Sequence, residues 1–172
     1  MRQNTASLTM ADALRFLCDE MLAGLGRWLR IAGYDTAIAA RGCRDRDLVE
    51  QANAEQRILL TRDRRLVEIR RANEWTIVLN GNSIDACAKE LVRRLALDWT
   101  FDPLSRCTLC NTPLDLADTR LLASLPPRIR AHGATVHVCP CCGHLYWEGS
   151  HVRCIRRRLE SFAHGGDEGD AD

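Results

Sequence analysis

Apolar residues in the first hundred positions alternate between short continuous runs and longer stretches with helical spacing. The run Ile58-Leu59-Leu60 has no polar alternation and lies between two helix-like stretches, 47–55 and 64–72. A short, wholly apolar run between helices is typical of a central strand in a parallel sheet that is covered on both faces. Shorter or mixed runs of the same kind predict three further strands, at 14–18, 34–39 and 75–79.

The segments between these runs have the periodicity of amphipathic helices. Between the first two strands, apolar residues recur every three or four positions and end at Gly33, a suitable helix stop. The same pattern predicts helices at 21–32, 45–55, 64–72 and 84–97. Strands that alternate with helices indicate βαβ units. The sequence therefore predicts an α/β fold with a parallel sheet of about four strands flanked by helices.

The character of the chain changes near position 102. Turn residues and two cysteine clusters follow, and then a basic helical stretch at 150–162. A glycine- and acid-rich end is typical of disorder. We therefore expect four parts: a disordered extension, an α/β domain, a cysteine module with its basic helix, and a disordered acidic tail, at 1–12, 13–102, 103–162 and 163–172.

Composition limits the function classes. The chain has 172 residues, is 46% hydrophobic and carries a net charge of +1, so it can bury a core and is not a strongly basic nucleic-acid binder as a whole. Lys89 is the only lysine among 24 basic residues. Arginine suits bidentate phosphate contacts, although a coding bias toward arginine would give the same count. No apolar run approaches the roughly 20 residues of a membrane span, and the first residues lack a secretory signal, so we expect a cytoplasmic protein without a membrane partner.

The cysteines give the most specific pattern. Two C-x2-C pairs, Cys107/Cys110 and Cys139/Cys142, are separated by 28 residues. Two such turns complete a tetrahedral zinc site, and four thiolates leave no open position for chemistry, so a structural zinc ion is predicted. Cys141 could replace a neighbouring ligand, but the C-x2-C spacing favours the outer pair. The odd total of nine cysteines, without a signal peptide, argues against a disulfide framework.

Three carboxylates occupy related positions in the predicted fold. Asp19 follows the first strand, Asp63 follows the third, and Asp45 opens the second helix. The carboxyl ends of parallel strands meet at one edge of the sheet. Carboxylates gathered there could hold Mg²⁺ or Mn²⁺, which can activate water and neutralise charge on a phosphodiester. Each acid could instead do no more than cap the helix that follows it.

Three stretches resemble the Mut-seven C-terminal RNase family. They are the motif that begins at Asp19 and continues through Leu25-Gly26-Arg27-Trp28-Leu29-Arg30, the motif Leu59-Leu60-Thr61-Arg62-Asp63, and the zinc ribbon followed by Tyr146-Trp147-Glu148-Gly149-Ser150-His151. The resemblance implies a PIN-like nuclease fold with a C-terminal zinc ribbon and metal-dependent RNase activity. By it, Asp19 and Asp63 fall on acids expected to hold metal, and Asp45 on the acid that opens the second helix. The residues that the resemblance places near RNA or beside an acid are Arg27, Arg30, Thr61 and Arg62. No fourth acid is assigned after the fourth strand, where Asn82 and Asp85 are the candidates.

These observations lead to a ribonuclease that hydrolyses RNA with a carboxylate-bound Mg²⁺ or Mn²⁺ ion. The basic helix from Arg153 to Arg158 would contact the RNA backbone, and Trp147 or Tyr146 would stack on bases. The helix could equally be a solvated face, and Trp147 could pack under the ribbon. Two alternatives stay open: a noncatalytic RNA- or ribosome-binding adaptor that uses the ribbon and basic helix, and a module whose ribbon contacts another protein.

Overall fold

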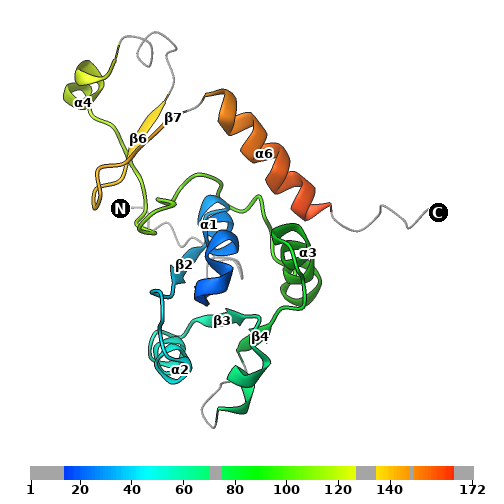
Figure 1. Ribbon diagram of the computed structural model, residues 1–172. Helices are drawn as coiled ribbons and strands as arrows, with labels where there is room; N and C mark the ends of the chain where they lie inside the picture. The colour runs from blue at the N-terminus through cyan, green and yellow to red at the C-terminus, as the bar shows by residue number, and fades with distance from the viewer. Residues whose placement is uncertain (1–13, 70–74, 127–134, 148, 165–172) are drawn as a thin grey trace, which may run out of the picture.

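A computed structural model describes residues 14–69, 75–126, 135–147 and 149–164 of the chain. It consists of a parallel sheet flanked by helices, a smaller antiparallel sheet and a long C-terminal helix (Figure 1). The predicted extension at 1–12 and the predicted tail beyond His164 lie outside the described residues.

The four strands of the larger sheet are all parallel and have the order β2-β1-β3-β4. These strands are β1 (Arg15–Cys18), β2 (Asp35–Ile38), β3 (Ile58–Thr61) and β4 (Thr76–Val78). The connecting helices are η1 (Glu20–Leu22), α1 (Ala23–Ile31), α2 (Asp45–Ala54), η2 (Arg64–Glu68) and α3 (Ile84–Leu95). The predicted fold class, an α/β sheet of four parallel strands flanked by helices, is confirmed.

Alternate residues of the strands are buried in two separate cores, one on each face of the sheet. Phe16 and Leu60 point to the face covered by α1 and α3. Leu17 and Leu59 point to the opposite face, where they pack against α2 and η2. Burial on both faces explains why β3 has no polar alternation.

The C-terminal helix α6 (Ser150–Ala163) completes the first of these cores. Phe162 lies edge-on to Trp28 of α1 and to Trp99, with ring centroids 5.4 and 4.9 Å apart. Leu159 is also fully buried there. The apolar side of the basic helix therefore packs on the α/β domain, although the helix follows the cysteine segment in sequence (Figure 1).

The cysteine segment carries the second sheet. Its strands are antiparallel and are two or three residues long: β5 (Asp115–Leu116), β6 (Val136–Val138) and β7 (Leu145–Trp147), with the short helix α4 (Thr119–Ser124) after β5. Strands this short leave no periodic signal in a sequence.

Two local predictions were wrong. The stretch after Asp63 forms only a 3₁₀ helix of five residues rather than a helix over 64–72, and residues 70–74 lie outside the described part of the chain. Leu66 is the only residue of this helix that is buried, which is too little apolar contact to stabilise a longer one. Asp45 is not the N-cap of α2, because Arg44 occupies that position. Asp45 lies in the first turn, where a carboxylate still interacts favourably with the helix dipole.

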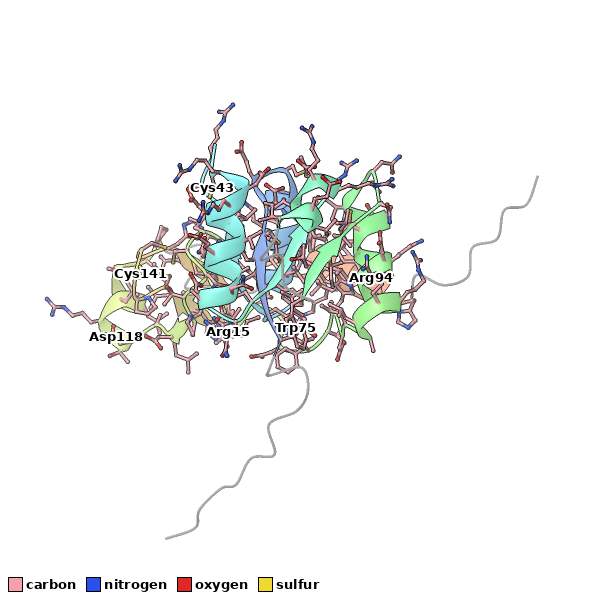
Figure 2. The ribbon with its side chains drawn as sticks, turned by 90° about the horizontal axis from the view of Figure 1, so that it is seen from below. Arg15, Cys43, Trp75, Arg94, Asp118 and Cys141 are labelled. Atoms are coloured by element: carbon pink, nitrogen blue, oxygen red, sulfur yellow. The ribbon has the colours of Figure 1, made fainter. Side chains whose placement is uncertain are left out.

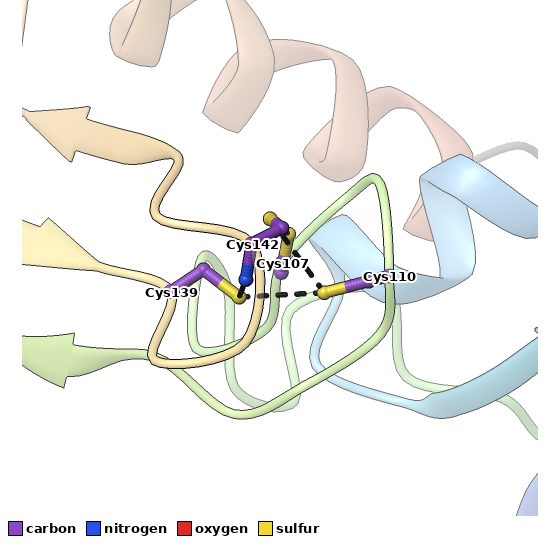
Figure 3. A group of neighbouring side chains, drawn as sticks. All are labelled: Cys107, Cys110, Cys139 and Cys142. Atoms are coloured by element: carbon purple, nitrogen blue, oxygen red, sulfur yellow. Dashed lines mark hydrogen bonds between the residues drawn. The ribbon is translucent and has the colours of Figure 1, made fainter.

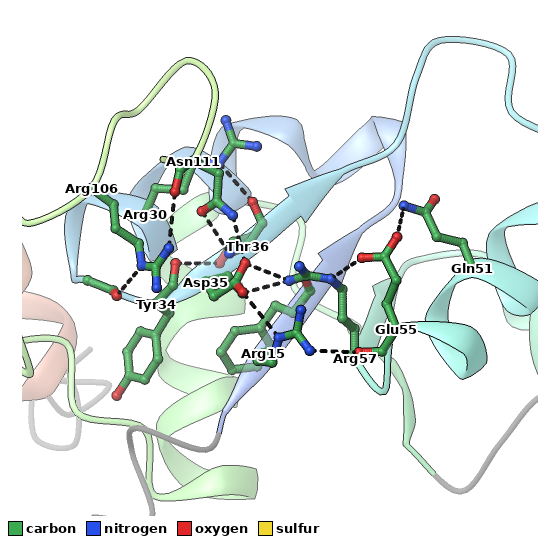
Figure 4. Close-up of polar contacts among 12 residues, drawn as sticks. Arg15, Arg30, Tyr34, Asp35, Thr36, Gln51, Glu55, Arg57, Arg106 and Asn111 are labelled. Carbon is green, nitrogen blue, oxygen red and sulfur yellow. Dashed lines mark hydrogen bonds and ion pairs between the residues drawn. The ribbon is translucent and has the colours of Figure 1, made fainter. Parts of the chain in front are cut away.

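A cluster of charged residues joins the amino-terminal ends of β1 and β2 to the cysteine segment (Figure 4). The carboxylate of Asp35 accepts hydrogen bonds from Arg57 Nη1 at 2.7 Å, Asn111 Nδ2 at 2.7 Å and Arg15 Nε at 3.1 Å. Burial raises the pKa of Asp35, but these hydrogen bonds outweigh it and lower the pKa to about 2. Asp35 therefore stays ionised in the folded protein.

The Asp35→Asn variant should lose this stabilisation in a pH-dependent way. The pKa of Asp35 is about 2 in the folded protein against an ordinary value of 3.8, so the ionised carboxylate contributes about 2 kcal/mol to folding near neutral pH. This contribution is complete above the ordinary pKa and is lost as the pH falls toward the folded pKa. Urea unfolding should show a large difference between parent and variant at pH 7 and a smaller one at pH 3. Asp115→Asn, at an exposed acid, is the control; a pH-independent difference for Asp35→Asn would contradict this account.

Candidate functional site

The four predicted zinc ligands converge on one point (Figure 3). Sγ of Cys110 lies 3.3 Å from that of Cys139 and 3.7 Å from that of Cys142, and the Cys107 and Cys142 sulfurs are 3.6 Å apart. All four sulfurs lie within 4.8 Å of one another. Zn–S bonds of about 2.3 Å in a tetrahedron place the sulfurs ~3.8 Å apart, so the group could hold a zinc ion. Cys141 is exposed and does not belong to the group.

Both cysteine pairs are built on the same turn. The amide of Asn111 donates to the carbonyl of Cys107 at 2.9 Å, and the amide of Gly143 donates to the carbonyl of Cys139 at 2.9 Å. Asn111 and Gly143 each have a φ of 72°. Glycine and asparagine adopt this left-handed conformation most readily. The residue that follows each C-x2-C pair is therefore of a type that can close the turn.

Hydrogen bonds act on the sulfurs in opposite directions and favour the metal-binding thiolate at Cys110. At Cys142 a backbone hydrogen bond from His144 lowers the pKa, but burial and bonds to the other cysteine sulfurs outweigh it and raise the pKa to about 12. Contacts with the side chain and backbone of Thr112 lower the pKa of Cys110 to about 6. The Tyr146 hydroxyl lies 3.2 Å from Cys107 Sγ and accepts a hydrogen bond from the amide of Thr108. Tyr146, which the sequence offered as a stacking residue, thus has its hydroxyl committed to the cysteine site.

Arg30 joins the first cysteine turn to the larger sheet. Its side chain is buried, with only 6% of the residue exposed. Nη1 donates to the carbonyls of Thr108 and Leu109 at 2.9 and 2.8 Å, and Nε donates to the carbonyl of Thr36 at 2.8 Å. The side chain of Asn111 accepts from the Thr36 amide at 3.0 Å. The cysteine turn therefore covers the edge of β2. Arg30, which was predicted to contact RNA, is instead buried between this turn and the sheet.

Asp19 and Asp63 lie at the carboxyl ends of the two central strands, with Thr61 between them. The hydroxyl of Thr61 donates to Asp19 Oδ2 at 2.7 Å and accepts from the amide of Asp63 at 3.0 Å. Thr61 is fully buried, so it holds the acids and is not open to a substrate. β1 and β3 are neighbours at the point where the strand order reverses, which is where open α/β sheets place their ligand sites.

Helix capping accounts for the side-chain position of some of the three acids but not of all. Asp63 accepts from the amide of Arg65 at 2.9 Å and so caps η2. Asp19 occupies the N-cap position of η1 but makes no side-chain cap bond. Asp45 is exposed in the first turn of α2. The orientation of Asp19 toward Thr61 is therefore the one that capping does not account for.

The acids do not form a closed ligand shell. Among the described residues, the cysteine group is the only set of three or more potential ligands whose donor atoms lie within 4.8 Å of one another. Mg²⁺ commonly keeps several waters and uses one or two carboxylates together with substrate phosphates. The oxygen donors of Asp19 and Asp63 suit that kind of open site.

Arginines surround this edge of the sheet. In Figure 2 the edge near Cys43 carries many nitrogen-tipped side chains, whereas Arg15 and Trp75 mark the opposite edge. Four of these arginines pair with nearby acids through Nε: Arg44 with Asp47 at 2.8 Å, Arg46 with Glu50 at 3.0 Å, Arg41 with Glu20 at 3.6 Å and Arg65 with Asp63 at 3.8 Å. We call this group the basic rim; its members, from the loops that follow β2 and β3 and the starts of α2 and η2, are Arg41, Arg44, Arg46, Arg62, Arg64 and Arg65, all exposed.

Of the predicted substrate-binding residues, Arg62 belongs to the basic rim and Arg27 is exposed on α1. The other members of the rim were missed by sequence reasoning. Their position in the loops beside the predicted acids was the available signal. Within the described ranges, no helix is long and apolar enough to cross a membrane.

The chain is similar in sequence to known proteins. The chain is 33% identical over 105 residues to the human protein named exonuclease mut-7 homolog, an alignment that covers 59% of this chain and 12% of the human protein. The chain thus spans a small part of that relative. No solved structure gives a significant match. The model of the Mut7-C RNAse domain matches residues 14–159, and because this range includes both the sheet with its acids and the cysteine site, the chain belongs to the Mut7-C RNAse domain family.

Proposed function

We propose that this protein is a metal-dependent ribonuclease whose active site lies at the carboxyl edge of the parallel sheet. The observation that carries this proposal is the pairing of Asp19 and Asp63 through the buried hydroxyl of Thr61. Asp19 makes no side-chain cap bond, and Asp63 caps η2 through Oδ1 alone. Both carboxylates retain oxygen atoms for a cation at the ligand-binding edge of the fold.

Asp19 and Asp63 would hold Mg²⁺ or Mn²⁺, with Asp45 as a third ligand from α2. When bound, such an ion lowers the pKa of water and neutralises charge on a phosphodiester. The protein's own contribution is to fix the two carboxylates. The amide of Asp19 is bonded to the carbonyl of Leu60 at 2.9 Å, so the backbone of the first acid is held by the neighbouring strand.

The basic rim supports a polyanionic substrate. Two carboxylates alone would repel a phosphodiester, whereas exposed guanidinium groups beside them attract it. Arg62 and Arg64 flank Asp63 in sequence and are both exposed, which makes them the rim residues nearest in sequence to the proposed centre. The family name supports RNA as the polymer.

The four cysteines would bind a zinc ion with a structural role. Four thiolates complete the tetrahedron and leave no position for substrate. The bonds from Arg30 and Asn111 to β2 mean that this ion would also order the edge of the larger sheet.

A noncatalytic RNA- or ribosome-binding adaptor is the second candidate. The absence of a closed shell around the three acids, among the described residues, is the observation that favours it. Salt-dependent RNA binding without cleavage in Mn²⁺ would identify this function.

Removal of either central carboxylate should abolish cleavage. We expect Asp63→Asn and Asp19→Asn to cut a labelled RNA at least ~100-fold more slowly than the parent in Mn²⁺, because each loses a charged metal ligand. Single-turnover cleavage of single-stranded and structured RNA measures this. Asp115→Asn removes an exposed acid from the small sheet and is the matched control. Equal cleavage by the parent and both active-site variants would show that the activity comes from a contaminant.

Thr61 should act as a positioning residue. Thr61→Val keeps the shape but removes the hydroxyl that bonds Asp19 and the amide of Asp63, and we expect a smaller loss of kcat, roughly 10-fold. Thr61→Ser retains the hydroxyl and should restore cleavage. A higher Mn²⁺ concentration for half-maximal activity in Thr61→Val, but not in Thr61→Ser, would separate a role in metal binding from general destabilisation. If Thr61→Ser did not restore cleavage, the role assigned to the hydroxyl would be contradicted.

Loss of zinc should destabilise both the cysteine module and the edge of β2 that Arg30 joins to it. The parent and Cys141→Ser should contain about one zinc ion per chain, and Cys107→Ser should contain much less. Hydrogen exchange should increase in the cysteine module of Cys107→Ser and, to a smaller extent, at Thr36, whose amide depends on Asn111. Equal zinc loss in both variants would mean that Cys141 is a ligand; unchanged exchange at Thr36 would mean that the β2 edge orders without the metal.

A further inference from the structure

A concave surface lies apart from the proposed nuclease centre. A groove of about 390 Å³ runs between the segment 102–105, strand β7 and the first half of α6. This volume lies in the range of small-ligand sites. Its walls are largely apolar and include Leu104, Val152 and Ile155. Trp147, with 44% of its surface exposed, and Arg156 also line it.

Tyr146 and Arg158, which lie beside or near the groove, are engaged in other contacts. The Tyr146 hydroxyl is engaged at the cysteine site. Arg158 pairs with Asp85 at 3.0 Å, and its guanidinium lies over the ring of Trp28 at 5.3 Å from the ring centroid. Trp147 therefore remains the accessible aromatic residue of the groove.

Three exposed arginines continue from the groove along α6. Arg156 and Arg157 follow Arg153 by three and four positions, so the three side chains lie on one side of the helix. The helix leads toward Asp85, which lies in the first turn of α3, just after β4 ends. The arginine stripe thus begins at the groove, on a helix that runs toward α3 (Figure 1).

The groove and the acids lie at opposite ends of α1. The amide of Leu104, at the groove, donates to the carbonyl of Ile31 at the end of α1. Asp19 precedes the start of the same helical segment. The nine residues of α1 span about 14 Å, so one nucleotide cannot occupy both places, whereas a strand of several nucleotides can.

We propose that this groove is an RNA-anchoring site that binds single-stranded RNA with a base stacked on Trp147 and phosphates along the arginines of α6. The choice of occupant rests on charge: Asp102 is the only acid that lines the groove within the described part of the chain, and the adjoining helix face is cationic. An exposed aromatic ring beside a basic track is the arrangement that binds single strands, whose bases are free to stack. In a duplex the bases are already paired and stacked. The proposal takes RNA as the polymer from the proposed function but does not require an active nuclease centre.

Binding can be measured with cleavage removed. The Asp63→Asn protein is titrated into a fluorescein-labelled single-stranded RNA of 12 nucleotides in a buffer without divalent ions or chelator, so that bound zinc is kept. Adding Trp147→Ala should weaken binding by at least about fivefold, because a stacking contact is lost. Adding Arg156→Gln should weaken it and reduce the slope of log Kd against log salt by about 0.7. The matched controls, Trp75→Ala and Arg93→Gln, alter an exposed tryptophan and an exposed arginine elsewhere and should bind like the starting protein.

Photo-cross-linking of an RNA that contains 4-thiouracil provides a direct readout. The cross-linked peptide should include Trp147 in the starting protein. The proposal is overturned if both groove variants bind normally, if the controls weaken binding equally, or if a duplex binds more tightly than the single strand. It is also overturned if no RNA binds. Cleavage by the unaltered chain is scored separately, so RNA binding through the groove without cleavage would reject the nuclease and leave this proposal standing.

Discussion

The buried guanidinium of Arg30 is the contact on which the union of the two parts depends. A buried charge is costly unless hydrogen bonds replace its water, and here three main-chain carbonyls do so, one from β2 and two from the first cysteine turn. The turn must be folded for Arg30 to be satisfied, and Arg30 must be in place for the turn to lie against the sheet. The metal-binding segment and the edge of the α/β domain are consequently stabilised together, which explains how a module with strands of two or three residues keeps a fixed position.

The topology of the sheet creates the proposed centre, and one side chain refines it. Adjacent parallel strands bring Asp19 and Asp63 to the same edge although they are far apart in sequence. The topology alone fixes the positions of the two backbones but not the orientation of the side chains. Thr61, buried between them, donates to one acid and accepts from the backbone of the other, so a single hydroxyl couples the two positions. The basic rim lies outside this pair and counters its charge toward an approaching phosphate.

Sequence patterns predicted the parts of the fold that follow from burial. The continuous apolar run of β3 and the spacing of the four cysteines each have one dominant physical cause, so the strand and the ligand set could be predicted. The position of Arg30 could not be predicted, because it lies off the apolar stripe of α1 and two of its three carbonyl partners, Thr108 and Leu109, lie 78 and 79 positions later. The acids were found as candidates, but the hydrogen bond between Thr61 and Asp19 depends on a rotamer that no spacing encodes.

The abundance of arginine has two interpretations, phosphate binding and coding bias, and the structure adds a third. Arg57, Arg94 and Arg106 all donate to main-chain carbonyls, as Arg30 does. A guanidinium presents five donors in a planar fork, whereas an ammonium is a compact point charge. Arg106 uses two nitrogens to bond the carbonyls of Gly33 and Asn111 at once, a geometry that lysine does not reproduce. Arginine therefore has a structural role at these positions, which neither phosphate binding nor codon usage is needed to explain.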